Sequence, residues 1–171
     1  MSKTTFPTKI LAETSVIVAL SIILKDVLPP IYHLPQGGSV TIAGLVPLVW
    51  FALRRGFRYS LFAGFIYGLV HMMLGGYVIN PVQGLLDYPL AFAALGLSGL
   101  FRKYPLVGVG VGITGRFIFS FLSGIFFFTS VTLEGALASA SYNGTYLIGE
   151  FAISAIVIYL IVKRNLIDIY L

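Results

Sequence analysis

One carboxylate stands in a long apolar stretch of the sequence, GLLDYPLAFAALG, which runs from Gly84 to Gly96. A charge placed in membrane hydrocarbon costs about 2.5–3.5 kcal/mol on insertion scales, so such a charge usually has a binding or pairing role. Asp87 lies about six residues inside the expected helix, or ~9 Å from its outer end. We therefore expect Asp87 at the floor of an outward-facing pocket that selects a cation or a hydrogen-bond donor. The alternative is an ion pair between helices.

Two further charges, Arg116 and Glu150, also fall inside apolar runs. Counted from the inner ends of their helices, they lie at similar heights, ~18 Å and ~21 Å. We expect a structural salt bridge between them, because a buried charge needs a partner. If Glu150 faces the pocket instead, it would be a second negative group for a cationic ligand.

Uncharged side chains could complete such a pocket. His71 ends an apolar run at the depth of the pocket, although a histidine there is more often a packing residue. Asn143 opens the last apolar run, where it could equally be an N-cap or turn residue. Ser120, Gly124 and Phe128 share one helix face, so the small residues could make room for a planar ring that stacks on Phe128. A tight contact between helices explains Ser120 and Gly124 equally well.

Membrane helices are the elements that must position these residues. Of the 171 residues, 58% are apolar and only 10% are charged, whereas soluble domains carry about 25% charged residues. The apolar runs are continuous, which disfavours the alternating strands of a β-barrel. We expect an all-α membrane protein that forms one integral membrane domain over 1–171. Its six transmembrane helices would cover residues 8–30, 40–54, 57–75, 81–101, 104–129 and 142–164. Pro47 interrupts the second of these ranges, which is also short.

Basic residues orient these helices through the positive-inside rule. With the N-terminus inside, nine basic residues fall on the inner side, and only Lys25, beside Asp26, falls on the outer side. The pattern predicts cytoplasmic N- and C-termini and a multi-pass protein of the prokaryotic cell membrane, with its pocket near the outer face. The nine residues are Lys3, Lys9, Arg54, Arg55, Arg58, Arg102, Lys103, Lys163 and Arg164.

Several function classes have little support. The sequence lacks GxSxG, HExxH and P-loop motifs, contains no cysteine, and has two histidines that are far apart, so we expect no enzyme, cofactor or metal site. The net charge is +5, but the longest basic cluster is RRGFR, which argues against nucleic-acid binding. Without a nucleotide site, active transport would require other subunits. Ser15 and Ala19 form a small-xxx-small pair that allows another helix to approach closely.

The chain resembles the thiamine-specific substrate-binding (S) component of energy-coupling factor (ECF) transporters. The resemblance covers nearly the whole chain and rests on LPQGGSVTIAGLVPL, FALRRGFRYSLFAGFIYGLVH, NPVQGLLDYPLAFAALGLSGLF and SYNGTYLIGEFAISAIVIYLIVK. It implies a six-helix membrane protein that binds a vitamin near the outer surface. It also implies docking on a membrane coupling subunit with two ATPase subunits, which would hydrolyse ATP. The small-residue face with Ser15 and Ala19 would dock on the coupling subunit.

The same resemblance implies roles for individual residues. Asp87 and Tyr88 match an acidic residue followed by tyrosine, so the carboxylate would receive the cationic, amine-bearing vitamin and Tyr88 would shape the same wall. Asn143, Gly124 and Phe128 match an asparagine, a glycine and an aromatic ring of the family's site.

The chain departs from the family pattern at four positions. Ser120 and Ala138 replace a histidine and a tyrosine, Phe128 replaces an indole, and Glu150 has no counterpart. The expected function is high-affinity thiamine binding for an ECF importer. The departures keep open a thiamine precursor or a related cationic or amine-bearing heterocycle as the ligand. A structural membrane protein without a small ligand, or a stand-alone secondary transporter, would also be compatible with the sequence.

Overall fold

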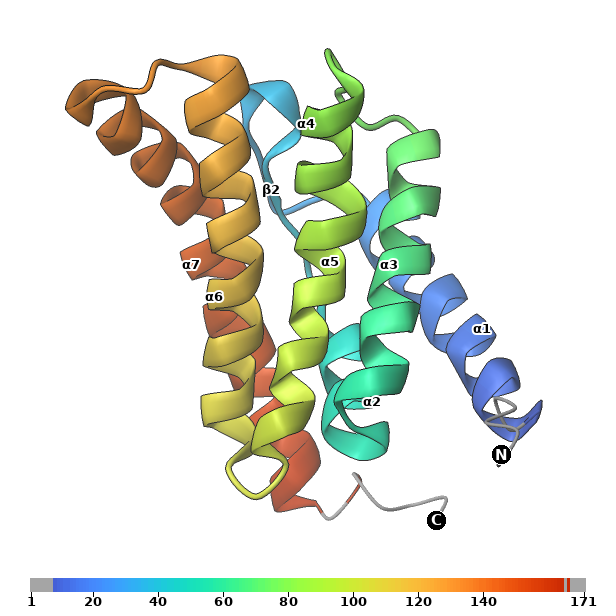
Figure 1. Cartoon of the computed structure of the whole chain (residues 1–171). Coiled ribbons are helices and arrows are strands. Elements are labelled where there is room, and N and C mark those ends of the chain that lie inside the picture. Colours follow the sequence, from blue (N-terminus) through green and yellow to red (C-terminus); the bar gives the residue numbers. More distant parts are fainter. Residues whose placement is uncertain (1–7, 165, 167–171) are drawn as a thin grey trace, which may run out of the picture.

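The computed structural model describes residues 8–164 and 166, which form a bundle of helices with one short β-hairpin (Figure 1). Helix α1 (Thr8–Ile22) continues into the π-helical turn η1 (Ile23–Val27). The remaining helices are α2 (Val46–Arg55), α3 (Phe57–Met73), α4 (Pro81–Leu85), η3 (Leu86–Leu90), α5 (Ala91–Ala94), η4 (Leu95–Phe101), α6 (Pro105–Ser123), η5 (Gly124–Phe128) and α7 (Leu133–Lys163). The mostly helical fold agrees with the expected fold class.

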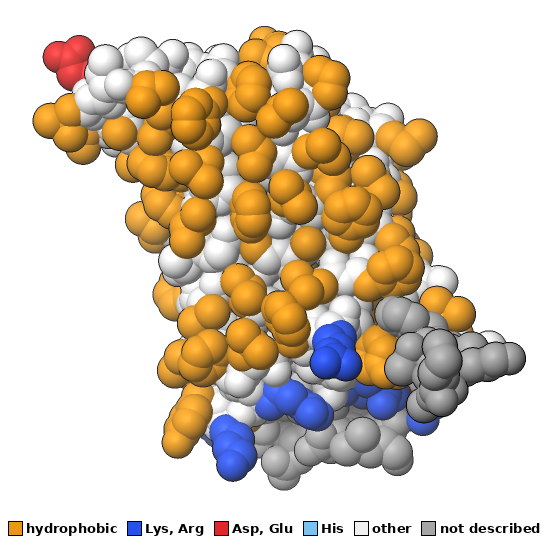
Figure 2. Space-filling model, in the orientation of Figure 1, with side chains coloured by type: hydrophobic (Ala, Val, Ile, Leu, Met, Phe, Trp, Pro, Cys, Tyr) orange, Lys and Arg blue, Asp and Glu red, His pale blue; other side chains and the backbone are white. Residues whose placement is uncertain are grey.

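Three helical stretches of the described residues are long and apolar enough to cross a membrane. They are Pro81–Phe101 with 21 residues, Pro105–Phe128 with 24 and Leu133–Lys163 with 31, and a span needs about 20. Apolar side chains cover most of the visible surface above the basic end of the molecule (Figure 2). A multi-pass membrane protein is therefore confirmed. Whether α1, α2 and α3 also cross stays a prediction.

The second helix differs from its predicted range of 40–54. It begins at Val46, and Pro47 lies in its first turn, where the missing N–H costs no helical hydrogen bond. Pro47 therefore starts this helix and does not interrupt it. Residues Ser39–Val40 form strand β2 instead.

The last helix also begins earlier than its predicted start at residue 142. Thr132 is its N-cap, and the Thr132 side chain accepts a hydrogen bond from the backbone N–H of Gly135 at 3.1 Å. Leucine and alanine at 133–138 are good helix formers, so the segment expected to be a loop is helical. Asn143 consequently lies within α7, and its alternative reading as an N-cap is wrong.

The expected outer loop after the first helix contains a β-hairpin. Strand β1 (Tyr32–His33) pairs antiparallel with β2, with Tyr32 opposite Val40 and His33 opposite Ser39. The tip is the short helix η2 (Pro35–Gly37), where Gln36 and Gly37 have φ angles of 67° and 98°. Gly37 adopts this left-handed backbone without steric cost. In Figure 1 the tip lies at the end of the bundle where α4 begins.

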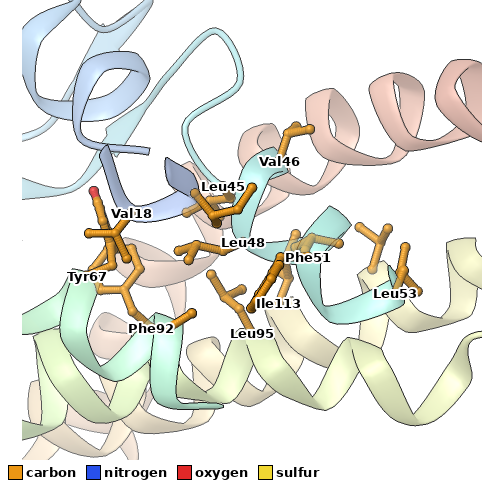
Figure 3. Close-up of a cluster of buried hydrophobic side chains, with 14 of the residues drawn as sticks. Val18, Leu45, Val46, Leu48, Phe51, Leu53, Tyr67, Phe92, Leu95 and Ile113 are labelled. Atoms are coloured by element: carbon orange, nitrogen blue, oxygen red, sulfur yellow. The ribbon is translucent and has the colours of Figure 1, made fainter. Parts of the chain in front are cut away.

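The apolar core is centred on the start of α2. Leu45, Leu48 and Phe51 are at most 2% exposed. Figure 3 shows Leu45 and Leu48 between the pair Tyr67 and Phe92 on one side and Ile113 on the other, with Phe51 beside Ile113. α3 approaches the helix at 86–94 closely through its glycines, because an added Cβ at Gly64 would overlap the carbonyl oxygen of Phe92. This backbone contact fixes α3 against the helix that carries Asp87.

A buried ion pair joins the end of the first helix to the last one. Lys25 Nζ lies 3.3 Å from Glu150 Oε1, and the two side chains are 2% and 0% exposed. The same oxygen accepts hydrogen bonds from the backbone N–H and the hydroxyl of Thr41, at 3.0 and 2.8 Å. The predicted Arg116–Glu150 bridge is therefore wrong, because Lys25, expected at the outer surface, is buried in η1 and pairs with Glu150.

The opposite end of the bundle is basic. Arg55 makes two hydrogen bonds of 2.5 Å to Glu13, which join α1 to α2. Arg102 donates to the carbonyl oxygens of Leu53 and Arg54 at 2.8 and 2.6 Å, which caps the C-terminus of α2. Lys and Arg side chains gather at the end where α1 begins and α7 ends (Figures 1 and 2). Lys3 lies outside the described residues.

The close contact at Gly64 predicts that adding a methyl group there and at Gly144 will change stability by different amounts. Gly64→Ala should lower stability by about 1–3 kcal/mol because the new Cβ has no room. Gly144→Ala, where nothing lies within 4 Å of the added Cβ, should be neutral or stabilise by up to about 1 kcal/mol. Thermal unfolding in detergent measures both. Equal melting temperatures for the two variants would contradict the close approach at Gly64.

The buried ion pair predicts a large cost for removing one partner. Lys25→Met leaves the Glu150 carboxylate buried without its cation, and we expect a loss of about 3–5 kcal/mol. Adding Glu150→Leu should restore much of the stability, since an apolar pair avoids burying charge. The same unfolding assay compares the wild type with the single and double variants. A double variant no more stable than the single one would argue against the pair.

Candidate functional site

The bundle encloses a cavity of about 310 Å³ between the hairpin tip, α3, η3, α5, η5, α6 and α7. That volume lies within the range of small-molecule sites, about 300–1,000 Å³. The residues that line it are Gln36, Gly37, Gly38, His71, Tyr77, Asp87, Tyr88, Phe92, Arg116, Ser120, Gly124, Phe128, Thr129, Ala138, Ser139, Tyr142, Asn143 and Tyr146.

The cavity brings together most of the residues that the sequence singled out. The lining includes His71, Asp87, Tyr88, Ser120, Gly124, Phe128 and Asn143. Their contribution to ligand binding stays a prediction. Glu150 is the exception, because it does not line the cavity and its Oε1 is already bound by Lys25 and Thr41.

Asp87 lies in the π-helical turn η3, which includes Pro89. Single π-helical turns inside α-helices are frequent at functional sites. Gln83 Nε2 and Ser123 Oγ each donate a hydrogen bond of 2.7 Å to the same carboxylate oxygen, Oδ2. None of the salt bridges of the described residues includes Asp87. Neutral donors thus hold the carboxylate while its charge stays available to a ligand.

Tyrosines form the rim of the cavity. The Tyr142 hydroxyl donates to the carbonyl oxygen of Pro35. It also accepts a hydrogen bond of 3.0 Å from the backbone N–H of Gly38. An added Cβ at Gly38 would come within 2.8 Å of the Tyr146 ring. These contacts fix the hairpin tip against α7. Tyr77 and Phe128 face each other across the rim, with ring centroids 6.1 Å apart.

Small and amide side chains close the contact between α6 and α7. A Cβ at Gly124 would collide with the Ser139 hydroxyl, which donates to the carbonyl oxygen of Phe121 at 2.9 Å. Asn143 Nδ2 donates to the carbonyl oxygens of Ser139 and Ser120, at 3.0 and 3.3 Å. Gly124 and Ser120 therefore both line the cavity and belong to a tight contact with α7. Room for a ligand ring beside them stays a prediction.

Arg116 is a cavity residue that the sequence reasoning assigned to a salt bridge. The residue is 6% exposed, and its guanidinium lies 4.1 Å from the Phe92 ring centroid and 5.9 Å from that of Tyr146. Its Nε and Nη1 atoms have no hydrogen-bond partner among the described residues. Two aromatic faces therefore stabilise this cation, whose buried Nε and Nη1 atoms keep unused hydrogen-bonding capacity.

The sequence reasoning also missed the hairpin tip and two tyrosines of α7. Gln36–Gly38 enter the lining because the hairpin folds back over the bundle. Tyr142 and Tyr146 are four residues apart and flank Asn143, so helical spacing would have placed all three on one face. All three residues fall within the predicted helix 142–164, so this signal was present in the sequence.

The site has the chemistry of a binding site. One carboxylate, one guanidinium, several hydroxyl and amide groups, and six aromatic rings converge on it, the rings coming from Tyr and Phe at 77, 88, 92, 128, 142 and 146. The described residues contain no group of three or more His, Cys, Asp or Glu that could hold a metal ion. Such a site fits a planar, positively charged molecule with polar substituents.

The predicted docking pair lies away from the cavity. Ser15 and Ala19 are exposed on α1, and the Ser15 hydroxyl bonds the carbonyl oxygen of Leu11 at 3.0 Å. Their side chains leave this face of α1 open for a second helix. Docking on a coupling subunit stays a prediction.

Comparisons with known proteins identify the family of this chain. The model of the thiamine transporter protein family matches residues 11–168. Thiamine transporter ThiT of Bacillus subtilis (strain 168) is 34% identical over 171 residues, covering 88% of each chain. ThiT of Lacticaseibacillus paracasei is 29% identical, covering 74% of this chain and 71% of that protein. A solved structure of ThiT from Listeria monocytogenes aligns with a TM-score of 0.80 and 26% identity, over 91% of this chain and 94% of that one. The chain belongs to the thiamine transporter protein family.

Proposed function

We propose that this protein is the thiamine-binding S component of an ECF importer in a prokaryotic plasma membrane. The observation that carries the proposal is the Asp87 carboxylate, which lines the cavity and is held only by the neutral donors Gln83 and Ser123 among its described partners. Thiamine has a permanently cationic thiazolium ring and an amino-substituted pyrimidine. Both groups suit a carboxylate acceptor, and the names of the relatives support the same ligand.

In this proposal each wall of the cavity meets one part of the vitamin. Asp87 Oδ1 receives the cation or the amino group, since Oδ2 already accepts two hydrogen bonds. Phe128 and Tyr88 present faces on which a flat ring can stack, while Ser120 and Gly124 leave it room. Asn143 and His71 supply polar edges. Ala138 also lines the cavity, so the space of the absent tyrosine is open to the ligand.

The orientation follows from the two ends of the bundle. We propose six crossings with both termini in the cytoplasm, because the basic side chains gather where α1 begins and α7 ends. The cavity lies toward the other end, under the hairpin tip. Thiamine would then enter from outside.

A coupling subunit and two ATPase subunits complete the importer in this proposal. The sequence contains no P-loop, so the energy must come from partners. The exposed small-residue face with Ser15 and Ala19 is the proposed contact with the coupling subunit. The basic end would face the ATPases.

A role without a small ligand is less well supported. That role requires an ion pair of Arg116 with Asp87 or Glu150 that fills the cavity. Among the described residues Glu150 pairs with Lys25, and neither Arg116 nor Asp87 forms a salt bridge.

Titration of the purified protein tests the ligand. We expect saturable thiamine binding that is much tighter than binding of the isolated aminopyrimidine half, since the half lacks the cation. Calorimetry suits the measurement, because the single tryptophan, Trp50, does not line the cavity. Tighter binding of the fragment would favour a thiamine precursor as ligand. No binding of either compound would contradict the proposal.

Neutralising the cavity carboxylate should weaken binding without unfolding the protein. For Asp87→Asn we expect about 10- to 150-fold lower thiamine affinity, the value of a hydrogen bond to a charged group. Glu134→Gln removes the same charge from an exposed position on α7 outside the cavity lining, and its affinity should equal that of the wild type. A folded Asp87→Asn variant with unchanged affinity would remove Asp87 from the site.

A further inference from the structure

A buried glutamine lies behind the cavity, between its carboxylate and its rim. Gln83 belongs to α4, is 1% exposed and does not line the cavity. Its amide nitrogen Nε2 donates to Asp87 Oδ2 at 2.7 Å and to the carbonyl oxygen of Tyr77 at 3.1 Å. Its oxygen Oε1 accepts from the backbone N–H of Ile79 at 3.0 Å. One amide group therefore bonds both the carboxylate and the segment that joins α3 to α4.

These hydrogen bonds fix the orientation of the Gln83 amide. A glutamine amide has two N–H donors and a carbonyl acceptor, and both donors and the acceptor are used here. Turning the amide over would place its oxygen against the Asp87 carboxylate and the Tyr77 carbonyl, which accept hydrogen bonds when ionised or neutral respectively. It would also place the amide NH₂ against the N–H of Ile79. Because unpaired buried groups are costly, the amide keeps one orientation.

The segment held by Gln83 carries part of the cavity rim. Tyr77 lines the cavity and faces Phe128, with ring centroids 6.1 Å apart. Its carbonyl oxygen also accepts a longer bond of 3.4 Å from the Tyr88 hydroxyl. Tyr77 and Ile79 are about half exposed, so packing restrains them less than core residues and their backbone hydrogen bonds matter more. In Figure 1 this segment crosses from the end of α3 to the start of α4.

We propose that Gln83 is the positioning residue of Asp87 and couples this carboxylate to the rim segment Tyr77–Ile79. The inference rests on the proposed function, in which Asp87 Oδ1 takes the cationic or amino-bearing part of thiamine. A ligand at Oδ1 fixes the carboxylate, the carboxylate fixes the amide, and the amide fixes the rim. Because such coupling is reciprocal, a rim held by Gln83 favours the ligand by the same factor.

Two variants that each remove a donor from the same carboxylate oxygen test the proposal. Gln83→Met keeps an unbranched side chain but lacks the amide, so it releases both Asp87 and the rim. Ser123→Ala removes the other donor to Oδ2, which comes from α6 at 2.7 Å, while the bonds of Gln83 to the rim remain. We expect both variants to bind thiamine about three- to tenfold more weakly, the value of one hydrogen bond. Calorimetry on the full-length protein in detergent measures these affinities.

A fluorescent reporter on the rim distinguishes the two variants. Trp50→Phe removes the single tryptophan, and Ile79→Trp places one at an exposed position of the rim segment outside the cavity lining. With saturating thiamine, we expect a shift of the emission maximum in the reporter protein and in its Ser123→Ala variant, but none in Gln83→Met. Saturation removes differences in affinity, so a purely structural loss at Gln83 would leave the shift intact. Equal shifts in all three proteins, or no shift in the reporter protein itself, would overturn the coupling.

A double-mutant cycle tests whether Gln83 acts through Asp87. If it does, Gln83→Met should weaken thiamine binding by less than about twofold in the Asp87→Asn background, because the group that it positions is already changed. An equal factor in both backgrounds would mean that Gln83 has only a structural role, which overturns the inference while the proposed function stands. If the wild type does not bind thiamine, the proposed function itself fails.

The coupling can also be tested without any change at Gln83, which covers the case that Gln83→Met does not fold. Asp87→Asn is introduced into the reporter protein, and thiamine is again added to saturation. We expect a smaller shift of the emission maximum than with Asp87, because a neutral amide bonds Gln83 more weakly than a carboxylate does. An unchanged shift would contradict the proposed link between carboxylate and rim.

Discussion

The Oε1 atom of Glu150 is the point on which the cavity-bearing half of the molecule depends. It accepts from Lys25 at the end of the first helix and twice from Thr41, directly after β2. A buried carboxylate is costly unless charged and hydrogen-bonding partners surround it. This requirement holds η1, the strand after the hairpin tip and α7 together at one place. Val40 of β2 also packs against Gly149 of α7, and Lys25 donates to the Ser39 hydroxyl at 3.3 Å, so the base of the hairpin is fixed at the same place.

The position of the hairpin then determines the shape of the cavity. With its base fixed at Thr41, its tip reaches Tyr142, which bonds both Pro35 and Gly38. On the opposite wall, the contact of Gly124 with Ser139 fixes the distance between η5 and α7. Backbone and small-residue contacts therefore determine the walls. The polar side chains between them are free to match a ligand.

The sequence predicted the parts of this arrangement that depend on composition and spacing alone. The helices predicted at 57–75 and 81–101 and the one-sided face of Ser120, Gly124 and Phe128 follow from apolar runs and helical periodicity. Charge pairing was not predictable in this way, because partners depend on how each helix is rotated about its axis. Arg116 and Glu150 have matching heights, yet Lys25, 125 residues away from Glu150 along the chain, is its partner. The hairpin depends on long-range contacts, which no local pattern reports.

The buried charges around the cavity have a consequence for the kind of ligand. Lys25 and Glu150 form one ion pair, and Asp26 bonds both His71 and Tyr67. Arg116 is stabilised by aromatic faces, and Asp87 by neutral donors. When His71 is neutral, these two cations and three carboxylates leave one negative charge in a region of low dielectric constant. A ligand with a single permanent positive charge neutralises it, whereas a neutral ring of the same shape would leave it uncompensated. The arrangement therefore favours a monocation such as thiamine through charge as well as through shape.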